Sequence, residues 1–252
     1  MSANAPALQR ALGRDRQIVI GGLLAAIALA WAYLLAGAGM QMPAPTAWTP
    51  TYFALILLMW WVMMAAMMLP SAAPTILLFA ALSRKSAERG DPTVSTGVFA
   101  STYIVVWGGL SLLATSIQMQ LDQLTLLSPM MKSASVPLGA ALLIAAGVYQ
   151  MTPLKYACLR HCRTPIDFFA RRWRRGTKGA FLMGLEHGAF CLGCCWVMMG
   201  LLFYAGVMNL LWVAGLAVYV LLEKLAPAGQ RISRFAGIAL ILWGVAVLVN
   251  WR

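Results

Sequence analysis

Residues 51–82 read TYFALILLMWWVMMAAMMLPSAAPTILLFAAL, and they contain no charged side chain. A run this long and this apolar is typical of a helix that crosses a lipid bilayer, for which about 20 apolar residues suffice. Pro70 and Pro74 lie in the second half of the run, and a proline inside a helix removes a backbone hydrogen-bond donor. We therefore expect one membrane-spanning helix here, with a kink or a break near Leu69.

The rest of the chain has the same apolar character. Hydrophobic residues make up 62% of the 252 residues and charged residues only 10%, whereas about a quarter of the residues of a soluble domain are charged. Further apolar runs lie near 17–38, 93–117, 136–157, 179–205, 207–223 and 235–250. The sequence predicts an all-α fold, a polytopic transmembrane helical bundle of about seven spans that forms a single integral membrane domain over residues 1–252.

The formal charge of +12 raises the question of a nucleic-acid partner. The basic residues lie between the apolar runs, however, and if the N-terminus is cytoplasmic, 17 of the 19 lysines and arginines fall in cytoplasmic segments. The two exceptions are Lys132 and Arg252. This distribution follows the Lys/Arg bias that orients membrane helices. We therefore expect the lipid bilayer of a bacterial inner membrane as the partner, a cytoplasmic N-terminus and no nucleic acid.

All five cysteines and both histidines lie within two short clusters. One is CLRHC at residues 158–162, and the other is EHGAFCLGCC at residues 186–195. The basic segment between them is long enough for the two helices to pack side by side. No Gly-rich phosphate loop, Ser-His-Asp arrangement or zincin motif is present in the sequence. The chemistry is therefore expected inside the bundle, and an enzymatic activity is not favoured.

Helical geometry places the members of each cluster on shared faces. At about 100° per residue, His187, Cys191 and Cys194 lie on one face, which Met198 extends. Cys195 lies on the flank of this face, and Gly184, Gly188 and Gly193 allow another helix to approach closely. In the first cluster, Cys158 and Cys162 are four residues apart and share a face, with His161 beside them. Ionisable residues such as Glu186 and His187 are costly inside a membrane and usually mark a partner or a site.

Methionines indicate which metal such a site would hold. Met59, Met63 and Met67 recur every fourth residue and form one stripe along the helix predicted over 51–82. Met64 and Met68 form an adjacent stripe. Alone, these stripes favour core packing. Beside cysteine and histidine they complete a soft ligand set that selects Cu(I) over hard cations. We therefore expect copper, as Cu(I), while zinc remains the alternative because Cys and His also suit tetrahedral zinc.

Three motifs together resemble the bacterial DUF2182 family, which is described as predicted metal-binding integral membrane proteins. They are MWWVMMAAMMLPS at 59–71, PLKYACLRHCRTP at 153–165 and HGAFCLGCCWVM at 187–198. The resemblance extends over a metal-motif core of about 51–225. It implies a multi-span helical fold and a bound metal. The metal-site positions that the resemblance implies are Met63, Met64, Met67, Met68, Cys158, Cys162, His187, Cys191, Cys194 and Cys195.

The working hypothesis is copper handling, by transfer, insertion or transport, with a copper-receiving protein as the partner. His187, Cys191 and Cys194 would be the primary ligands, and a relay would consist of Met67, Met68, Cys158 and Cys162. Glu186 would support the site by orienting His187 or by accepting a proton, and His161 would support it from beside Cys162. Glu223 and Lys224 are adjacent, so we expect them to anchor the membrane interface first and to contact the site second.

Two other classes of protein remain open. A membrane thiol–disulfide oxidoreductase would use Cys158 with Cys162, or Cys194 with Cys195, and the pair Cys191 and Cys194 has Cys-x-x-Cys spacing. A structural membrane subunit would use its cysteines only for packing. The sequence leaves the oligomeric state open.

Overall fold

The computed structural model describes residues 5–37, 48–92, 94–128 and 131–250, with side chains from Gln17 onward. Within these ranges the regular structure is helical, and one isolated antiparallel bridge joins Leu127 to Ser133. The helices are α1 (Ala5–Leu35), α2 (Pro50–Ala87), α3 (Thr96–Gln123), α4 (Val136–Gln150), α5 (Pro153–Arg163), α6 (Pro165–Arg172), α7 (Gly176–Gly200), α8 (Leu202–Ala205), α9 (Leu210–Leu225) and α10 (Gly229–Val249). The predicted all-α class is confirmed.

Five segments of the described chain are long and apolar enough to cross a membrane. They are Gln17–Leu35 of α1, α2, α3, Gly176–Ala205 and α10. Helices α4 and α5 meet at a bend of 64° and add a sixth span if they count as one. Helix α9 has 16 residues, about 24 Å at 1.5 Å per residue, which is shorter than the roughly 30 Å hydrocarbon core. Length and composition therefore support five or six spans, and the expected count of seven is not confirmed.

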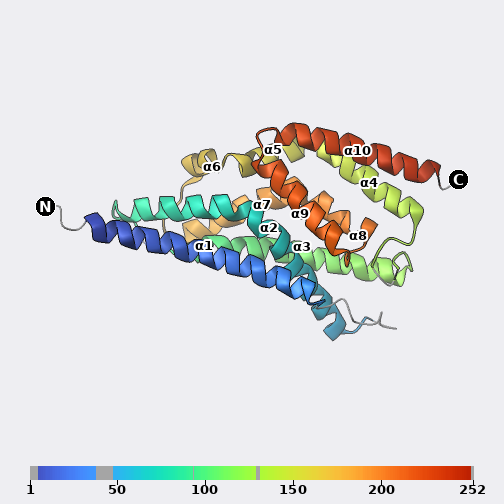
Figure 1. Cartoon of the computed structure of the whole chain (residues 1–252), viewed down its shortest axis with the longest axis horizontal. Coiled ribbons are helices and arrows are strands. Elements are labelled where there is room, and N and C mark those ends of the chain that lie inside the picture. Colours follow the sequence, from blue (N-terminus) through green and yellow to red (C-terminus); the bar gives the residue numbers. More distant parts are fainter. Residues whose placement is uncertain (1–4, 38–47, 93, 129–130, 251–252) are drawn as a thin grey trace.

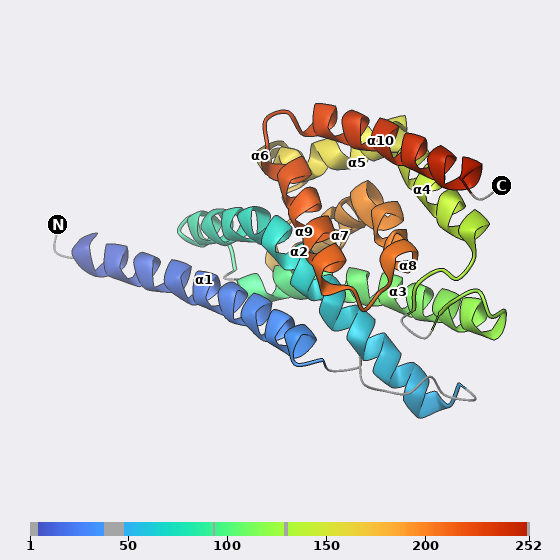
Figure 2. The ribbon, with the colours of Figure 1, turned by 45° about the vertical axis from the view of Figure 1, so that its right-hand side comes forward.

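Helix α2 carries both prolines and remains one helix from Pro50 to Ala87. Figures 1 and 2 show that it changes direction part of the way along its length. Near the prolines, the Ser71 hydroxyl donates a hydrogen bond to the Met68 carbonyl over 2.9 Å. A proline inside a helix lacks one donor and pushes against the preceding turn, so a bend is the expected response. The chain has the predicted kink, and the helix is not broken.

Helix α7, which carries the second cysteine cluster, lies at the centre of the helical assembly. It contacts α3, α4, α5, α8 and α9, and Figure 2 shows it enclosed by these helices. Helices α4 and α10 run along one another on one side, and α1 packs against α2 on the other (Figure 1). The α7 side chains are therefore placed where several helices can reach them.

Glycines bring the neighbours of α7 close, as expected. A Cβ atom at Gly184 would lie 2.8 Å from the Phe99 carbonyl oxygen of α3. A Cβ atom at Gly193 would lie 2.8 Å from Cys158 Sγ of α5. These distances are too short for real Cβ contacts, so only glycine allows the observed approach of α3 and α5 to α7.

Candidate metal centre

The two cysteine clusters meet between α5 and α7. Cys191, Cys194 and Cys195 of α7 are all buried, with at most 1% of each side chain exposed. Cys162 of α5 places its Sγ 4.0 Å from Cys194 Sγ. All five cysteines of the chain are free thiols. The 64° bend between α4 and α5 carries the end of α5 toward α7, which brings together sulfur atoms that are 32 residues apart in the sequence.

Helix α2 brings its methionines to the same core. Met68 Sδ lies 3.9 Å from Cys195 Sγ. Met63, Met64 and Met67 are equally buried and belong to the same hydrophobic core cluster as the α7 cysteines. The interior therefore holds two pairs of neighbouring sulfur atoms. Cys162 and Cys194 form a pair of thiols, and Cys195 and Met68 form a pair of a thiol and a thioether.

His187 lies one turn before Cys191 on α7 and is 2% exposed. Its Nδ1 shares a hydrogen bond with the Tyr103 hydroxyl of α3. Its Nε2 is buried and has no hydrogen-bond partner in the described part of the chain. A buried polar atom without a partner calls for an explanation. When Nδ1 donates to the Tyr103 oxygen, the Nε2 lone pair remains free for a soft metal ion.

Within the described residues, Glu186 forms no hydrogen bond or ion pair with the His187 ring. Its carboxylate forms ion pairs with Arg172 and, over 3.7 Å, with Arg174. Tyr103 therefore fills the orienting position that we expected for Glu186. The sequence contained one signal for this, since a tyrosine in an apolar helix needs a hydrogen-bond partner for its hydroxyl.

Lys224 of α9 reaches directly into the cysteine cluster. Its Nζ donates hydrogen bonds to Cys191 Sγ and to Ser71 Oγ of α2, each over 3.1 Å. The side chain is 4% exposed. A positive charge thus lies inside the core, in contact with one of the predicted ligands.

The neighbouring Glu223 is fully buried and makes an ion pair of 2.8 Å with Lys155 of α5, which is also fully buried. The hydroxyls of Tyr219 and Ser233 donate to the same carboxylate. The expectation that Glu223 and Lys224 serve first as interface anchors is therefore wrong. Adjacent helical residues point about 100° apart. Helix α9 therefore contacts α5 through Glu223, and it contacts α7 and α2 through Lys224.

Cys158 and His161 lie at the edge of the cluster. Cys158 is partly buried against Gly193, and the His161 ring stacks on Phe190 with centroids 4.1 Å apart. Beside His161 is a cavity of about 220 Å³ that Phe168 and several arginines also line. The Phe168 ring meets the His187 ring edge-on at 5.0 Å. Phe168 thus separates this basic cavity from the buried histidine.

The site is not a closed ligand cage. Within the described ranges, no three His, Cys, Asp or Glu side chains lie close enough together to hold a metal ion. The contacts instead come in pairs, Cys162 with Cys194 and Cys195 with Met68. Thiol and thioether groups are soft donors, and a low-coordinate soft ion such as Cu(I) can be held by two or three of them.

The fold and the site together define a helical protein with long apolar helices around a buried set of thiol, thioether and imidazole groups. Residues 57–247 match the PpoB2 family, described as a copper chaperone. Because this match covers most of the chain, the protein belongs to that family. The match supports the copper part of the resemblance carried by the three sequence motifs. No curated protein and no solved structure matches the chain.

Proposed function

We propose that this protein is an integral inner-membrane copper chaperone, which binds Cu(I) between α5 and α7 and delivers it to a receiving protein. One observation carries the proposal, the approach of Cys162 Sγ to within 4.0 Å of Cys194 Sγ from a separate helix. The surrounding donors, Cys191, Cys195 and His187, are buried and soft or borderline. A hard cation would find too few oxygen ligands there.

Charge balance adds support for bound Cu(I). A Cu(I) ion held by two thiolates carries one net negative charge, which is costly in a buried site of low dielectric constant. Lys224 places one positive charge 3.1 Å from Cys191 Sγ. The loaded site would therefore be close to neutral, with Lys224 as the counterion.

The paired sulfur contacts suit transfer as well as binding. The Met68–Cys195 pair lies next to the Cys162–Cys194 pair, because Cys194 and Cys195 are consecutive residues of α7. Met63, Met64 and Met67 extend the soft donors along α2, and Cys158 with His161 extends them to the basic cavity at the end of α5. Exchange from one pair to the next would move the ion without releasing it into the core.

The same proposal includes the membrane topology. The total reaches seven, with the N-terminus in the cytoplasm, when the bent α4–α5 pair counts as one span and α9 crosses the membrane despite its shorter length. The Lys/Arg distribution supports this orientation. The C-terminal end of α5 together with α6, with their arginines and the cavity beside His161, would then face the cytoplasm.

Elemental analysis of reduced, anaerobic, detergent-purified protein tests the proposed copper site. We expect stoichiometric copper in the unmodified protein, loss of copper in a Cys162→Ser, Cys194→Ser double variant, and weaker retention in Met68→Leu. Met151→Leu is the control, because its thioether is 46% exposed and outside the core. Copper retained by the double variant, or zinc found in place of copper, would contradict the proposal.

A thiol–disulfide function is the second candidate, and the same sulfur pair favours it. Cys162 and Cys194 are free thiols 4.0 Å apart, and a disulfide needs about 2.05 Å between the two sulfur atoms. Thiol trapping distinguishes the two functions. A Cys162–Cys194 pair that cycles with added oxidant in metal-free protein would support redox chemistry, whereas thiols that copper protects from alkylation would support the chaperone.

A further inference from the structure

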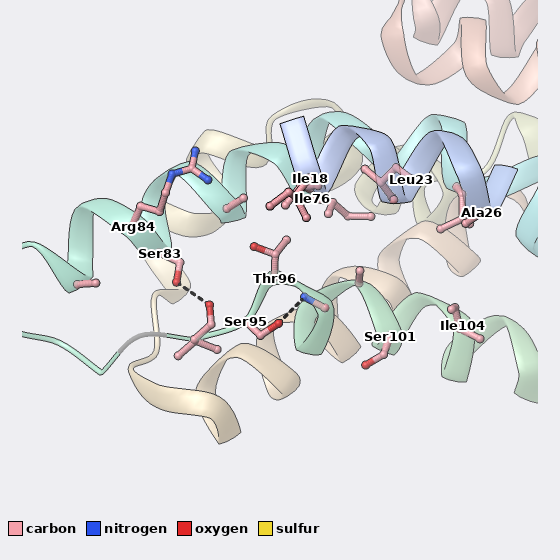
Figure 3. A pocket seen from close by; sticks show the side chains of 18 of the residues that line it. Ile18, Leu23, Ala26, Ile76, Ser83, Arg84, Ser95, Thr96, Ser101 and Ile104 are labelled. Carbon is pink, nitrogen blue, oxygen red and sulfur yellow. Dashed lines mark hydrogen bonds between the residues drawn. The ribbon is translucent and has the colours of Figure 1, made fainter. Parts of the chain in front are cut away.

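A cavity of about 910 Å³ lies between α1, α2 and α3, away from the sulfur cluster. None of the residues of the candidate metal centre lines it. Its volume is within the range of about 300–1,000 Å³ typical of ligand pockets. Figure 3 shows the cavity as a long space with α1 on one side and α3 on the other. The metal centre therefore does not account for this space.

The two ends of the cavity differ in chemistry. In Figure 3, Arg84 and Ser83 lie at one end, Ser95 and Thr96 follow toward the middle, and Leu23, Ala26 and Ile104 lie toward the other end, where Ser101 is the polar side chain. Most of the wall between them is apolar. A ligand that fills this space must therefore be polar at one end and hydrocarbon over most of its length.

The cavity exists because α1 packs loosely. Helix α1 is the least buried of the five candidate spans. A Cβ atom added at Gly22, which lines the cavity, would meet no described atom within 4 Å. Water gains little in an apolar space with few polar partners, whereas a hydrocarbon chain gains free energy for each methylene group that it buries. In a membrane, the available hydrocarbon is a lipid acyl chain.

The polar end favours a negative headgroup. Arg84 is half-buried on α2, and no ion pair joins it to another described side chain. Helix α3 begins at Thr96, which lines the same cavity, and the N-terminus of a helix carries partial positive charge. Guanidinium groups bind phosphate through short charge-assisted hydrogen bonds. Glu88, which also lines the cavity, is more exposed and lies one turn further from the apolar walls.

We propose that this cavity binds one anionic phospholipid of the cytoplasmic leaflet, with its phosphate at Arg84 and Thr96 and an acyl chain between α1 and the α2–α3 pair. The inference rests on the proposed membrane location with a cytoplasmic N-terminus. The lipid completes the packing of α1, and copper binding does not depend on it, because the sulfur cluster shares no lining residue with this cavity.

The chain offers two matched pairs of variants. Gly22 and Gly21 both have open space around them, but only Gly22 lines the cavity. Gly22→Leu therefore fills the space, and Gly21→Leu adds the same side chain elsewhere on α1. Arg84 and Lys85 are adjacent bases, of which only Arg84 lines the cavity. Arg84→Gln and Lys85→Gln remove the same charge from different places.

The measurement is native mass spectrometry of delipidated protein titrated with phosphatidylglycerol or phosphatidylcholine, with copper content determined on the same preparations. We expect a preference for phosphatidylglycerol in the unmodified protein, and loss of both lipids in Gly22→Leu but not in Gly21→Leu. Arg84→Gln should weaken phosphatidylglycerol binding about tenfold and abolish the preference, while Lys85→Gln keeps it.

Equal lipid binding by Gly22→Leu and Gly21→Leu, or equal binding of the two lipids by the unmodified protein, would overturn the proposal. Arg84→Gln keeps the test decisive if Gly22→Leu does not accumulate. The copper measurement separates the two proposals. Protein without copper but with the expected lipid pattern would refute the copper site alone, and lost lipid selectivity with normal copper content would refute the lipid site alone.

Discussion

At the scale of single residues, Lys224 changes the interpretation of the cysteine cluster most. An ammonium group with 4% exposure is rare, and here it donates to Cys191 Sγ and Ser71 Oγ. Buried charges in proteins are normally paired or bind metals. A cluster of thiols alone would accumulate negative charge on binding Cu(I), and Lys224 supplies the opposite charge at the place where it is needed.

The Lys224→Gln variant tests this role. We expect the affinity for Cu(I) to fall about 10–100-fold, as is usual when a group that supports metal ligands is removed. Glutamine keeps most of the side-chain stem and a donor, so the loss reports the charge. Competition with a chromophoric Cu(I) chelator measures the affinity. Lys178→Gln is the control, since it removes an exposed charge from the same helix as Cys191. Equal affinities for the two variants would contradict a counterion role.

At the scale of elements, the helix pairs around α7 are held in two different ways. The α4–α10 pair relies on glycine, because a Cβ atom at Gly237 would lie 2.8 Å from the Gly147 carbonyl oxygen. The α5–α9 pair relies on the buried ion pair between Lys155 and Glu223. Removing one partner of a buried ion pair leaves an uncompensated charge. The position of the α5 cysteines therefore depends on contacts made outside the sulfur cluster.

The Gly237→Ala variant tests the close packing of α4 and α10. The added methyl group collides with backbone, so the helices must separate, and we expect the stability to fall by about 1–3 kcal/mol. Gly215→Ala is the matched control, because a Cβ there meets nothing within 4 Å and alanine favours the helix. Thermal unfolding in one detergent compares the two. An unfolding temperature for Gly237→Ala as high as that for Gly215→Ala would show that the close approach of α4 and α10 does not limit the stability of the protein.

At the scale of the whole molecule, the distribution of charge supports the proposed orientation. Arg172, Arg174 and Arg175 gather near the start of α7, where they pair with Glu186 and Asp91. Lys132 lies beyond the opposite end of α3, in the segment that connects it to α4. Only one orientation in the bilayer keeps the larger basic group in the cytoplasm.

Labelling of introduced cysteines tests this orientation. In intact cells, a membrane-impermeant maleimide should label a Lys132→Cys variant and should label Lys178→Cys only after permeabilisation. Both positions are exposed, and the unmodified protein provides the background from the five native cysteines. Labelling of Lys178→Cys in intact cells, with Lys132→Cys protected, would place the N-terminus outside.

Periodicity and residue type were enough to predict several features of this protein. The uncharged runs predicted the long helices, since a helix satisfies its own backbone in hydrocarbon. Pro70 and Pro74 predicted the kink in α2. The spacing within 186–195 placed His187, Cys191 and Cys194 on one face, because helical geometry is local. Each of these three side chains is buried in the structure. Their role as ligands stays a prediction.

Contacts between helices were beyond the reach of such patterns. Nothing in the spacing of Cys158 and Cys162 shows that only Cys162 comes within 4.0 Å of Cys194. Nothing around Tyr103 shows that its hydroxyl meets His187 from α3. Nothing around Lys224 shows that its ammonium group contacts Cys191 directly from α9. Sequence thus determined the apolar helices, the distribution of charge and the types of soft donor side chain, because each depends on residues close together in the chain. Tertiary structure decided which of these donor side chains meet and which charge lies beside them, because helix bends and glycine contacts far apart in sequence set the distances between side chains.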